Sequence, residues 1–541
     1  MTLGGKGSLT VNSTNNNGVH TKDDLEVKNL TLSVNCVDNA LKGNDSVTVT
    51  SGNLTLIARQ GDGIKTSNSS IKYNDDGSVK KYKGIIEIDV GTLNIYSACD
   101  GIDAAYDVII TQALETTPTV VNIYTDKYSE YSEEVTAVSS GEYYLRSNTS
   151  SYNYSVYYYS SSDASVYTWA NATYYTYAKS SGSGGRPGSS SSYYYYYKVD
   201  KPSTSTYNKM IVYAYSSSQK VGQATSYYAK SSAVSQNDSY DTLPFTVSSS
   251  GISLSGWTNY TTTTPGGTGG PGGMQDGNTD KGDYSTKGVK ADNQITISGG
   301  TVNIKSYDDA IHANNDVTLE SGLSPLGNVT ISGGSITAYS NDDGLHADGT
   351  LSITDGTIKV TNSYEGLEGT YIRISGGEIS VKSSDDGVNG TTTSGTALDI
   401  SGGYLYVYAG GDGLDCNSQT QKTGMIISGG MTIVVSTSGG NSSLDTDKGY
   451  TVSGGFVLAV CPQGMTSEVQ NFTLGSGCYS TTKTGSFSAS SYLVVDGVVA
   501  LKMPTNIFNG FAIYLGETNS SITTTSSSTY SFDDNGVYRM A

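Results

Sequence analysis

The chain alternates apolar and polar residues in short runs that are separated by turns rich in glycine and aspartate. In a representative unit, Ser-Gly-Gly precedes the alternating run Thr301 to Lys305, and the pair Asp308-Asp309 then precedes a small residue and an aliphatic one. Alternation with a period of two predicts strands, and the Gly and Asp clusters predict tight corners. We therefore expect each unit to consist of short β-strands.

This unit recurs along most of the chain, at intervals as short as 21 to 23 residues. The small residue that opens its last corner stands at Gly18, Ala40, Gly63, Gly101, Gly288, Ala310, Gly344, Gly366, Gly387, Gly413 and, in a degenerate copy, Ser443. A unit of this length holds three short strands and three turns, which is one coil of a stacked solenoid. The sequence thus predicts an all-β fold, a right-handed parallel β-helix whose eleven coils would form a rod roughly 50 Å long.

Interruptions of the repeat divide the chain into four predicted regions. They are N-terminal β-helix coils at 1–104, a Tyr/Ser/Gly-rich insertion at 105–285, C-terminal coils at 286–475 and a β-rich C-terminal cap at 476–541. The insertion carries more than half of the 44 tyrosines. Tyrosine-rich alternating stretches have a high β propensity, so we expect a β side domain there, with a disordered low-complexity loop as the alternative.

Charge supports the idea that the insertion loops out of a continuous rod. If the coil containing Asp100 and Asp103 stacks directly on the coil containing Lys287 and Lys290, each carboxylate faces a lysine at its own position. We therefore expect these two coils to be neighbours.

Each strand also predicts which side chains face inward. Aliphatic residues of successive coils should stack as ladders, as in Ile379 and Val381 followed by Leu405 and Val407. The outward positions are polar in most coils but become Tyr404, Tyr406 and Tyr408 in one of them, followed by an apolar row from Met431 to Leu458. The three tyrosines are candidates for stacking against sugar rings. Burial of the whole row under the C-terminal segment is the alternative.

Net charge and composition exclude some classes of partner. The chain has 50 acidic and 31 basic residues among 541, a formal charge of −19, which argues against nucleic acid or an anionic membrane as the ligand of a broad basic surface. No apolar run approaches the length of a membrane span. The five cysteines show no zinc-binding spacing, and small buried thiols are the expected role. Several Asn-x-Ser/Thr sequons make glycosylation a hypothesis only.

The corners place carboxylates in columns along the rod. Stacked at about 4.8 Å, carboxylates repel one another unless a cation lies among them, and hard oxygen ligands favour Ca²⁺. The candidate calcium ligands are Asp308, Asp309, Asp342, Asp343, Glu365, Glu368, Asp385, Asp386, Asp412 and Asp415. The alternative is that these side chains only cap backbone amides at the corners.

All three histidines of the chain occupy one column, directly after the corner aliphatic residue. They are His20, His312 and His346, and Lys42, Lys65 and Lys290 occupy the same column. We interpret the histidines as charge compensation for neighbouring carboxylates. Metal binding or catalysis is the alternative, although no HxxxH-type spacing supports it.

The units SYDDAIHAN, SNDDGLHAD, NSYEGLEG, SSDDGVNG and GGDGLDCN, each preceded by an ISGG-type turn, carry a family resemblance. The chain resembles the carbohydrate-binding-domain proteins of the clostridial cellulose-binding β-helix family, which are related in fold to family 9 pectate lyases. The resemblance covers residues 5–104 and 286–475. It implies an extracellular or cell-surface, Ca²⁺-binding protein that attaches to cellulose or to pectic polygalacturonate. No signal peptide is visible in the chain, so this location is implied by the resemblance alone.

In the lyases, calcium is held by one Asp in a coil and by an Asp pair plus a further Asp in the next. Asp386, Asp412 and Asp415 imitate this layout, but Gly411 replaces one acid. The lyases also need a basic side chain near the ion, and Lys448 is a poor match. We therefore expect polysaccharide binding without catalysis, and we predict no catalytic residue. The alternatives are a surface filament or matrix protein that self-associates through the Tyr-rich block or the β-helix ends, and a Ca²⁺-dependent polysaccharide lyase.

Overall fold

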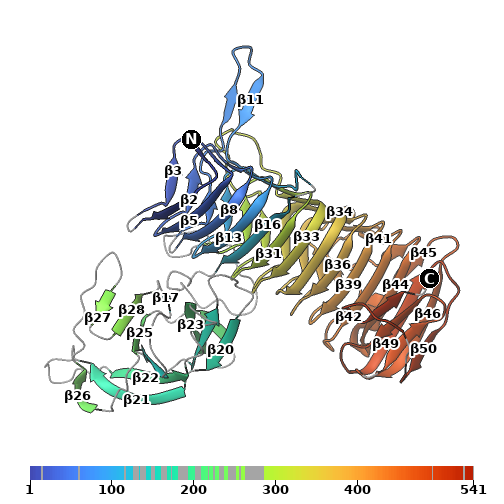
Figure 1. Cartoon of the computed structure of the whole chain (residues 1–541). Coiled ribbons are helices and arrows are strands. Elements are labelled where there is room, and N and C mark those ends of the chain that lie inside the picture. Colours follow the sequence, from blue (N-terminus) through green and yellow to red (C-terminus); the bar gives the residue numbers. More distant parts are fainter. Residues whose placement is uncertain are drawn as a thin grey trace.

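The computed structural model describes residues 1–13, 16–58, 61–114, 117–125, 285–489, 491–527 and 530–539, together with strands between residues 126 and 284. Successive strands stack in parallel into a β-solenoid of about 12 turns, drawn as a straight rod in Figure 1. This confirms the predicted parallel β-helix. The described residues include no helix that is long and apolar enough to cross a membrane.

Each coil contributes one strand to each of three parallel sheets. The first sheet follows the Gly-aliphatic corner and contains β3 (Val19–Thr21), β6 (Leu41–Gly43), β9 (Ile64–Lys65), β14 (Ile102–Ala104), β29 (Val289–Ala291), β32 (Ile311–Ala313), the first residues of β34 (Leu345–Asn362) and β35 (Leu367–Ile374), β37 (Val388–Gly390) and β40 (Leu414–Cys416). Its outward side chains form the surface described in the next subsection.

The second sheet contains β1 (Thr2–Gly4), β4 (Asp24–Lys28), β7 (Ser46–Val49), β12 (Ile85–Ile88), β15 (Asp107–Ile110), β30 (Gln294–Ile297), the start of β33 (Asn328–Tyr339), parts of β34 and β35, β38 (Leu398–Ile400), β41 (Met425–Ile427), β43 (Tyr450–Val452) and β45 (Phe472–Leu474). The third contains β2 (Ser8–Asn12), β5 (Leu30–Cys36), β8 (Gly52–Ala58), β13 (Gly91–Ser97), β16 (Thr119–Thr125), β31 (Thr301–Lys305), the ends of β33 and β34, β36 (Glu378–Lys382), β39 (Tyr404–Ala409), β42 (Met431–Ser436) and β44 (Phe456–Pro462).

The interior of the rod is a set of aliphatic ladders, as the alternation predicted. Ile379 pairs with Leu405 and Val381 with Val407 in neighbouring strands, and all four side chains are buried. The second glycine of each Ser-Gly-Gly turn makes the corner possible, because its backbone is left-handed; at Gly403, for example, φ is 82°. L-residues with a side chain rarely adopt this conformation.

The two coils on either side of the insertion are direct neighbours. Ile102 pairs with Val289 and Asp103 with Lys290, which confirms the stacking predicted from charge. The coil strands β15 and β16 extend to Thr125, beyond residue 104, where the sequence-based boundary was placed. The rod therefore continues unbroken across the insertion.

Twelve strands of the insertion form two further sheets. Figure 1 draws them beside the rod. They are β17 (Glu133–Glu134), β18 (Glu142–Ser147), β19 (Asn153–Tyr159), β20 (Tyr167–Asn171), β21 (Thr173–Ser180), β22 (Tyr193–Asp200), β23 (Lys209–Ser216), β24 (Gln219–Gly222), β25 (Ser226–Lys230), β26 (Asn237–Asp241), β27 (Ile252–Leu254) and β28 (Trp257–Thr261). The Gly/Ser/Pro-rich stretches between them lie outside the described residues. Self-association through the Tyr-rich block or the β-helix ends stays a prediction. A separate hairpin, β10 (Ile71–Tyr73) and β11 (Val79–Tyr82), projects from one coil.

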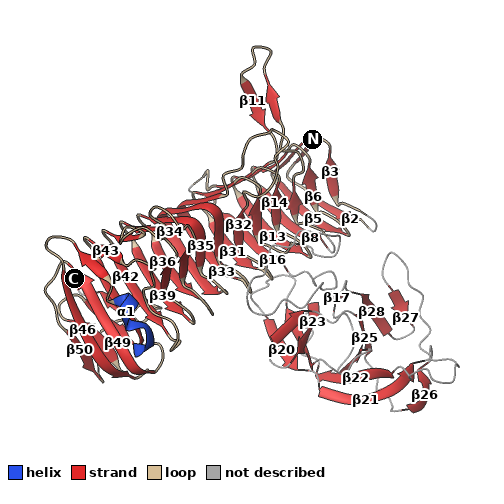
Figure 2. Ribbon diagram, turned by 180° about the vertical axis from the view of Figure 1, so that it is seen from behind, coloured by secondary structure: helices blue, strands red, loops and turns tan. Residues whose placement is uncertain are grey.

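The C-terminal segment covers both the end and one side of the rod. Figure 2 shows the short helix α1 (Thr466–Val469) at that end; it follows the 3-10 turn η2 (Gln463–Met465), and Val469 joins the core. Strands β49 (Ile507–Gly516) and β46 (Tyr479–Phe487) extend the third sheet in antiparallel fashion. A four-stranded sheet of β47 (Tyr492–Val495), β48 (Val499–Lys502), β50 (Ile522–Thr525) and β51 (Val537–Arg539) packs on the outward apolar row that includes Ile433 and Leu458. This confirms the burial alternative for that row.

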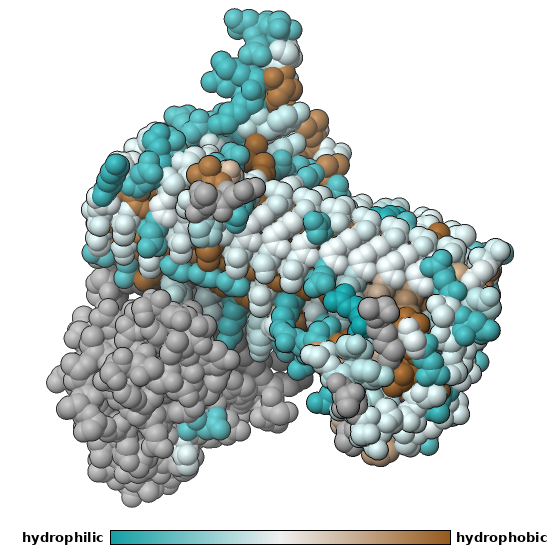
Figure 3. Space-filling model, turned by 45° about the vertical axis from the view of Figure 1, so that its right-hand side comes forward, coloured by the Kyte–Doolittle hydropathy of each residue, from teal (hydrophilic) through white to brown (hydrophobic). Residues whose placement is uncertain are grey.

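The five cysteines are all free thiols, four of them buried, so no disulfide links the coils. In the view of Figure 3, the rod surface consists mostly of polar and weakly hydrophilic residues. We therefore look for functional residues among the outward side chains that occupy the same position in successive coils.

Candidate functional site

The corner before the first sheet carries a row of side chains that we call the acidic column. Its members are Asn39, Asp62, Asp100, Lys287, Asp309, Asp343, Glu365, Asp386 and Asp412. In most coils one side-chain oxygen accepts the backbone N–H of the equivalent residue in the next coil. Examples are Asp62 Oδ1 with Asp100 N at 3.0 Å, Asp309 Oδ1 with Asp343 N at 3.0 Å and Asp386 Oδ1 with Asp412 N at 2.7 Å.

These bonds use one oxygen, Oδ1, of each carboxylate and leave Oδ2 for other contacts. Asn39 performs the same task, because its Oδ1 accepts the N–H of Asp62 at 3.1 Å. A neutral amide is thus sufficient for the ladder of corner bonds. The negative charge of the aspartates, and their second oxygen, need another explanation.

A second row, the flanking column, runs beside the acidic column three residues further along each coil. In register from coil to coil it reads His20, Lys42, Lys65, Asp103, Lys290, His312, His346, Glu368, Asn389 and Asp415. Its sign changes along the rod, from cationic in the N-terminal coils through two histidines to acidic or neutral in the C-terminal coils. The environment of the carboxylates changes with it.

In the N-terminal coils the carboxylates are paired with lysines. Lys65 Nζ lies 2.7 Å from Asp62 Oδ2 and also contacts Asp103, while Lys290 Nζ lies 3.9 Å from Asp103 Oδ1. Burial opposes ionisation, but the two lysines hold the pKa of Asp103 down at about 2. Burial raises the pKa of Asp100 to about 7 despite the nearby Lys290.

The coil that contains Lys290, the first after the insertion, also places a lysine between two predicted calcium ligands. Lys287, whose side chain is 3 % exposed, lies 3.0 Å from Asp308 Oδ2 and 3.4 Å from Asp309 Oδ2. Although burial opposes it, Lys287 and His312 hold the pKa of Asp309 well below its usual range. Asp308, Asp309 and Asp342 could in principle share a metal ion, since their oxygens lie within 4.8 Å of one another, but this lysine already supplies a cation.

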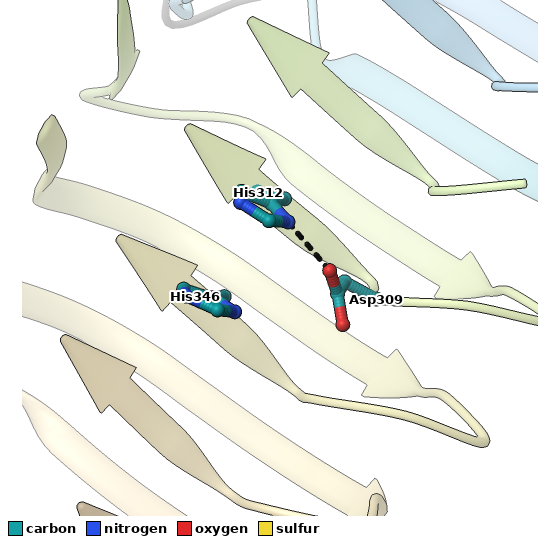
Figure 4. Close-up of side chains that lie close together, drawn as sticks. All are labelled: Asp309, His312 and His346. Atoms are coloured by element: carbon teal, nitrogen blue, oxygen red, sulfur yellow. Dashed lines mark hydrogen bonds and ion pairs between the residues drawn. The ribbon is translucent and has the colours of Figure 1, made fainter. Parts of the chain in front are cut away.

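Two histidines lie next in the flanking column, stacked face to face. Figure 4 shows their rings on successive strands, with the Asp309 carboxylate at the edge of His312. The ring centroids are 4.2 Å apart and the planes differ by 11°. His312 Nδ1 lies 2.6 Å from Asp309 Oδ2, and His346 Nδ1 lies 3.1 Å from Asp343 Oδ2.

The other ring nitrogens of the pair face one shared carboxylate. His312 Nε2 is 3.2 Å and His346 Nε2 is 3.4 Å from Oδ1 of Asp348. Burial alone would lower the pKa of His346, but its hydrogen bond to Asp343 and the surrounding carboxylates raise it to about 9. The predicted charge compensation is therefore present, although it extends to a residue, Asp348, that sequence reasoning missed.

The C-terminal coils hold carboxylates that make no ion pair within the described part of the chain. This group comprises Glu365, Asp386, Asp412, Asp415 and, in the coil beyond, Asp445. Burial, reinforced by the neighbouring carboxylates, raises the pKa of Asp386 and of Asp415 to about 7 and that of Glu365 to about 8. Their polar contacts are with amides: Asn389 donates to Glu365 Oε2 at 2.9 Å and Asn441 to Asp412 Oδ2 at 3.2 Å.

The ten predicted calcium ligands thus fall into environments of different charge rather than one continuous site. Asp308, Asp309 and Asp342 surround Lys287, and Asp343 and Glu368 border His346. Glu365, Asp385, Asp386, Asp412 and Asp415 lie in the C-terminal coils, where they have no basic partner among the described residues.

The prediction that Tyr404 and Tyr406 bind sugar is wrong. Both are buried, 6 % and 5 % exposed, beneath the four-stranded C-terminal sheet, and Arg539 lies over the Tyr404 ring. Tyr408, the third member of the row, is half-buried at the edge of the same apolar cluster. A ring that is covered on its outward face cannot stack on a ligand.

Tyr364 is an exposed aromatic residue that the sequence reasoning did not select. It is 40 % exposed and stands beside the C-terminal carboxylates, where Asp342 and Asp385 occupy the equivalent positions in adjacent coils. A hydrogen bond to Asp385 raises the pKa of its hydroxyl to about 12. The interruption of the acidic repeat by this residue in NSYEGLEG was the signal available in the sequence.

Comparison with known families gives one match. A family model described as "carbohydrate-binding domain-containing protein" matches residues 1–171, 244–326, 320–369 and 366–505, which is well over half of the chain. Searches of curated proteins and of solved structures give no significant match.

Proposed function

The chain belongs to the family of carbohydrate-binding domain-containing proteins, and from that premise we propose that it is a non-catalytic, Ca²⁺-dependent polysaccharide-binding protein that acts outside the cell. The observation that carries the calcium part is the group of five carboxylates in the C-terminal coils. These carboxylates repel one another and, within the described structure, have no basic partner.

Asp386, Asp412 and Asp415 would hold the ion, with Glu365 and Asp445 as neighbours. The donor set fits calcium in kind, since carboxylate oxygens are the hard ligands that this ion prefers. Among the described residues these three side chains do not form a group with oxygens within 4.8 Å of one another, so they would turn toward the ion as it binds. Protein ligands from only a few loosely held side chains correspond to weak sites, which fill at the calcium concentrations found outside cells. When bound, the ion supplies positive charge that can also attract the carboxylate of a uronate sugar.

Tyr364 supplies the second proposed element of the binding surface. Its ring is exposed next to Asp385 and Glu365, and an aromatic ring with a polar tip suits contact with both the apolar face and the hydroxyls of a sugar. The rigid strands on either side would hold this ring and the carboxylates at fixed separations along the rod. A long polymer could therefore contact several coils at once.

The proposal of binding without turnover rests on the lack of a matching base. The lyases that the chain resembles need a basic side chain near the ion. Lys448, the nearest candidate in sequence, is exposed and makes no ion pair with the C-terminal carboxylates among the described residues. Incubation with pectate and Ca²⁺ should produce no ultraviolet absorbance from an unsaturated uronate, and an increase of that absorbance would establish a lyase instead.

Affinity electrophoresis through gels containing polygalacturonate, and sedimentation with cellulose, test the binding proposal. We expect retardation by polygalacturonate that EGTA abolishes, and a loss of at least tenfold in affinity for the Asp386→Asn/Asp415→Asn double variant. Asparagine at 386 retains the corner bond, as Asn39 shows, so the fold should persist. Asp399→Asn, on the second sheet, is the matched control.

The outcomes separate the parts of the proposal. Retention by cellulose that resists EGTA but is lost in Tyr364→Ala would support aromatic binding and reject the calcium bridge. If polygalacturonate retards the double variant as strongly as the wild-type protein, this site is rejected. Binding to neither polymer would overturn the choice of ligand.

A further inference from the structure

The stacked histidines and Asp348 form a site whose donor atoms differ in kind from those of the proposed calcium group. His312 lies on β32, and His346 and Asp348 lie two residues apart on β34, so that both side chains point to the same face of the sheet. One strand thus supplies an imidazole and a carboxylate, and the adjacent strand supplies the second imidazole.

Both nitrogens of each ring face a carboxylate oxygen. Each Nδ1 lies within hydrogen-bond distance of a corner carboxylate, from Asp309 or from Asp343. The other oxygen of each carboxylate is held by a backbone N–H of the next coil, that of Asp343 or that of Glu365. A neutral imidazole that donates from Nδ1 presents a lone pair at Nε2.

In that neutral form both Nε2 lone pairs would face one carboxylate oxygen. The Nε2 atoms of both rings lie 3.2 and 3.4 Å from the same oxygen, Oδ1 of Asp348, while Oδ2 of Asp348 accepts the backbone N–H of Asn315 at 2.8 Å. Lone pairs facing one another at this separation are unfavourable unless a proton or a cation lies between them. Without a metal, protons occupy these positions, because the carboxylates of Asp309, Asp343 and Asp348 surround the two rings, and a bound divalent cation would replace the protons on the two Nε2 atoms.

We propose that His312, His346 and Asp348 bind a divalent transition-metal ion of the Zn²⁺ class through the two Nε2 atoms and Oδ1. Metal–ligand bonds of about 2.0 to 2.1 Å at tetrahedral angles separate the ligand atoms by about 3.4 Å. The observed nitrogen-to-oxygen distances of 3.2 and 3.4 Å agree with that separation. Borderline-soft imidazole nitrogens select this class of ion over Ca²⁺.

Asp309 and Asp343 act as positioning residues in this site. A carboxylate that accepts the second N–H of a metal-bound imidazole fixes its tautomer and orientation. The side chains of His346 and Asp348 are each 22 % exposed, so the ion can enter from solvent and the fourth ligand position is open to water. The bound ion would join two neighbouring coils.

The test uses tag-free full-length protein, stripped with a chelator and then saturated with Ca²⁺ so that the hard oxygen sites are filled. Titration with Co²⁺, followed by visible absorption, reports nitrogen ligands and tetrahedral geometry, and competition with Zn²⁺ gives the affinity. We expect one Co²⁺ per chain with an absorption band that one equivalent of Zn²⁺ removes. His346→Asn and Asp348→Asn should each weaken binding by tenfold or more.

His20→Asn is the matched control, because this third histidine occupies the same column but is exposed and faces only the Asn44 side chain. Asp309→Asn, which keeps the corner bond, should weaken binding by about 10- to 100-fold without abolishing it. Metal-free thermal melting of every variant shows whether it folds. Wild-type protein without the absorption band, or His20→Asn weakening binding as much as His346→Asn, would overturn the proposal. Because Ca²⁺ is present throughout, failure here leaves the polysaccharide-binding experiment unaffected.

Discussion

In the N-terminal coils the acidic column lies against lysines, whereas in the C-terminal coils it lies against other carboxylates and amides. Both halves have the same corner geometry and the same ladder of oxygen-to-backbone bonds. The difference resides in the flanking column, where Lys65 and Lys290 stand at one end and Asn389 and Asp415 at the other. The same backbone geometry therefore carries basic side chains in one part of the flanking column and neutral or acidic side chains in the other.

This difference suggests what each half is for. A lysine is a cation that the chain carries permanently, so a lysine-paired coil is complete without a ligand. In the proposed function, a coil whose carboxylates lack a basic partner is completed by an exchangeable cation, which would make its stability depend on calcium. The histidine pair lies between the two, in the coils where the flanking column changes sign.

The largest effect is expected from removing a built-in cation. Lys287→Met should lower the free energy of unfolding by about 3 to 5 kcal/mol, because it leaves the buried Asp309 and its neighbour Asp308 without their shared partner. Denaturant titration in EGTA measures the change. Lys359→Met is the control, since Lys359 and Asp534 form an exposed pair 3.3 Å apart that should contribute less than about 1 kcal/mol. Equal losses in the two variants would contradict the buried ion pair.

The sequence predicted the rod and even the pairing of coils across the insertion, because both follow from strictly repeated spacing. The period of two placed Ile379 and Leu405 in the core, and charge matched Asp103 to Lys290. These features depend on local geometry that each coil repeats. Aligning the repeats of the chain with one another therefore predicts which residues stack in successive coils.

The contacts that the sequence did not predict depend on segments that pack onto the rod and on side-chain orientation, rather than on the repeat itself. Tyr404 and Tyr406 alternate outward just as a sugar platform would, and only the return of the C-terminal segment buries them. Asp348 was missed because its partners come from the orientation of two imidazole rings, which the spacing of residues does not determine. Repetition specifies position, but the direction of a side chain depends on its neighbours.

The next prediction removes the exchangeable cation from the C-terminal coils. At a Ca²⁺ concentration 100-fold above its dissociation constant, the ion should stabilise the protein by about 2.7 kcal/mol relative to EGTA. The Asp386→Asn/Asp415→Asn variant should lose this increment, and Asp62→Asn, in the lysine-paired half, should retain it. Denaturant titrations with and without Ca²⁺ provide the measurement. A calcium effect of equal size in all three proteins would place the ion elsewhere.

A lysine introduced into the flanking column of the C-terminal coils should give their carboxylates a basic partner, as in the N-terminal coils. Asn389 is in register with Glu368 and Asp415, at the position that Lys65 and Lys290 occupy in their own coils. Asn389→Lys should therefore reduce the calcium-dependent stabilisation to less than half, because a fixed cation now lies among the carboxylates. Asn389→Gln carries no charge and should leave the increment unchanged. If both variants lose it equally, packing at this buried position accounts for the loss.

The smallest expected effect is a pH dependence that differs in sign between Asp103 in the N-terminal coils and Asp386 and Asp415 in the C-terminal coils. Asp103 has a pKa of about 2 in the folded protein, below the value of about 3.9 in an unfolded chain, so its stabilisation is present above about pH 4 and is lost as the pH falls towards 2.

In the C-terminal half, Asp386 and Asp415 have raised pKa values of about 7, so their contribution is largest below about pH 4 and is lost as the pH rises through 7. In EGTA, the thermal midpoint should therefore fall between pH 5 and pH 8, by a modest amount because these carboxylates are partly exposed to solvent. Saturating Ca²⁺ should flatten this slope, since the ion replaces the protons. The Asp386→Asn/Asp415→Asn variant should show a shallower slope in EGTA, with a remainder from Asp100, Glu365 and Asp445, whose pKa values of about 7, 8 and 6 are raised in the same direction. A slope that is identical in wild type and variant would assign the pH dependence to carboxylates other than Asp386 and Asp415.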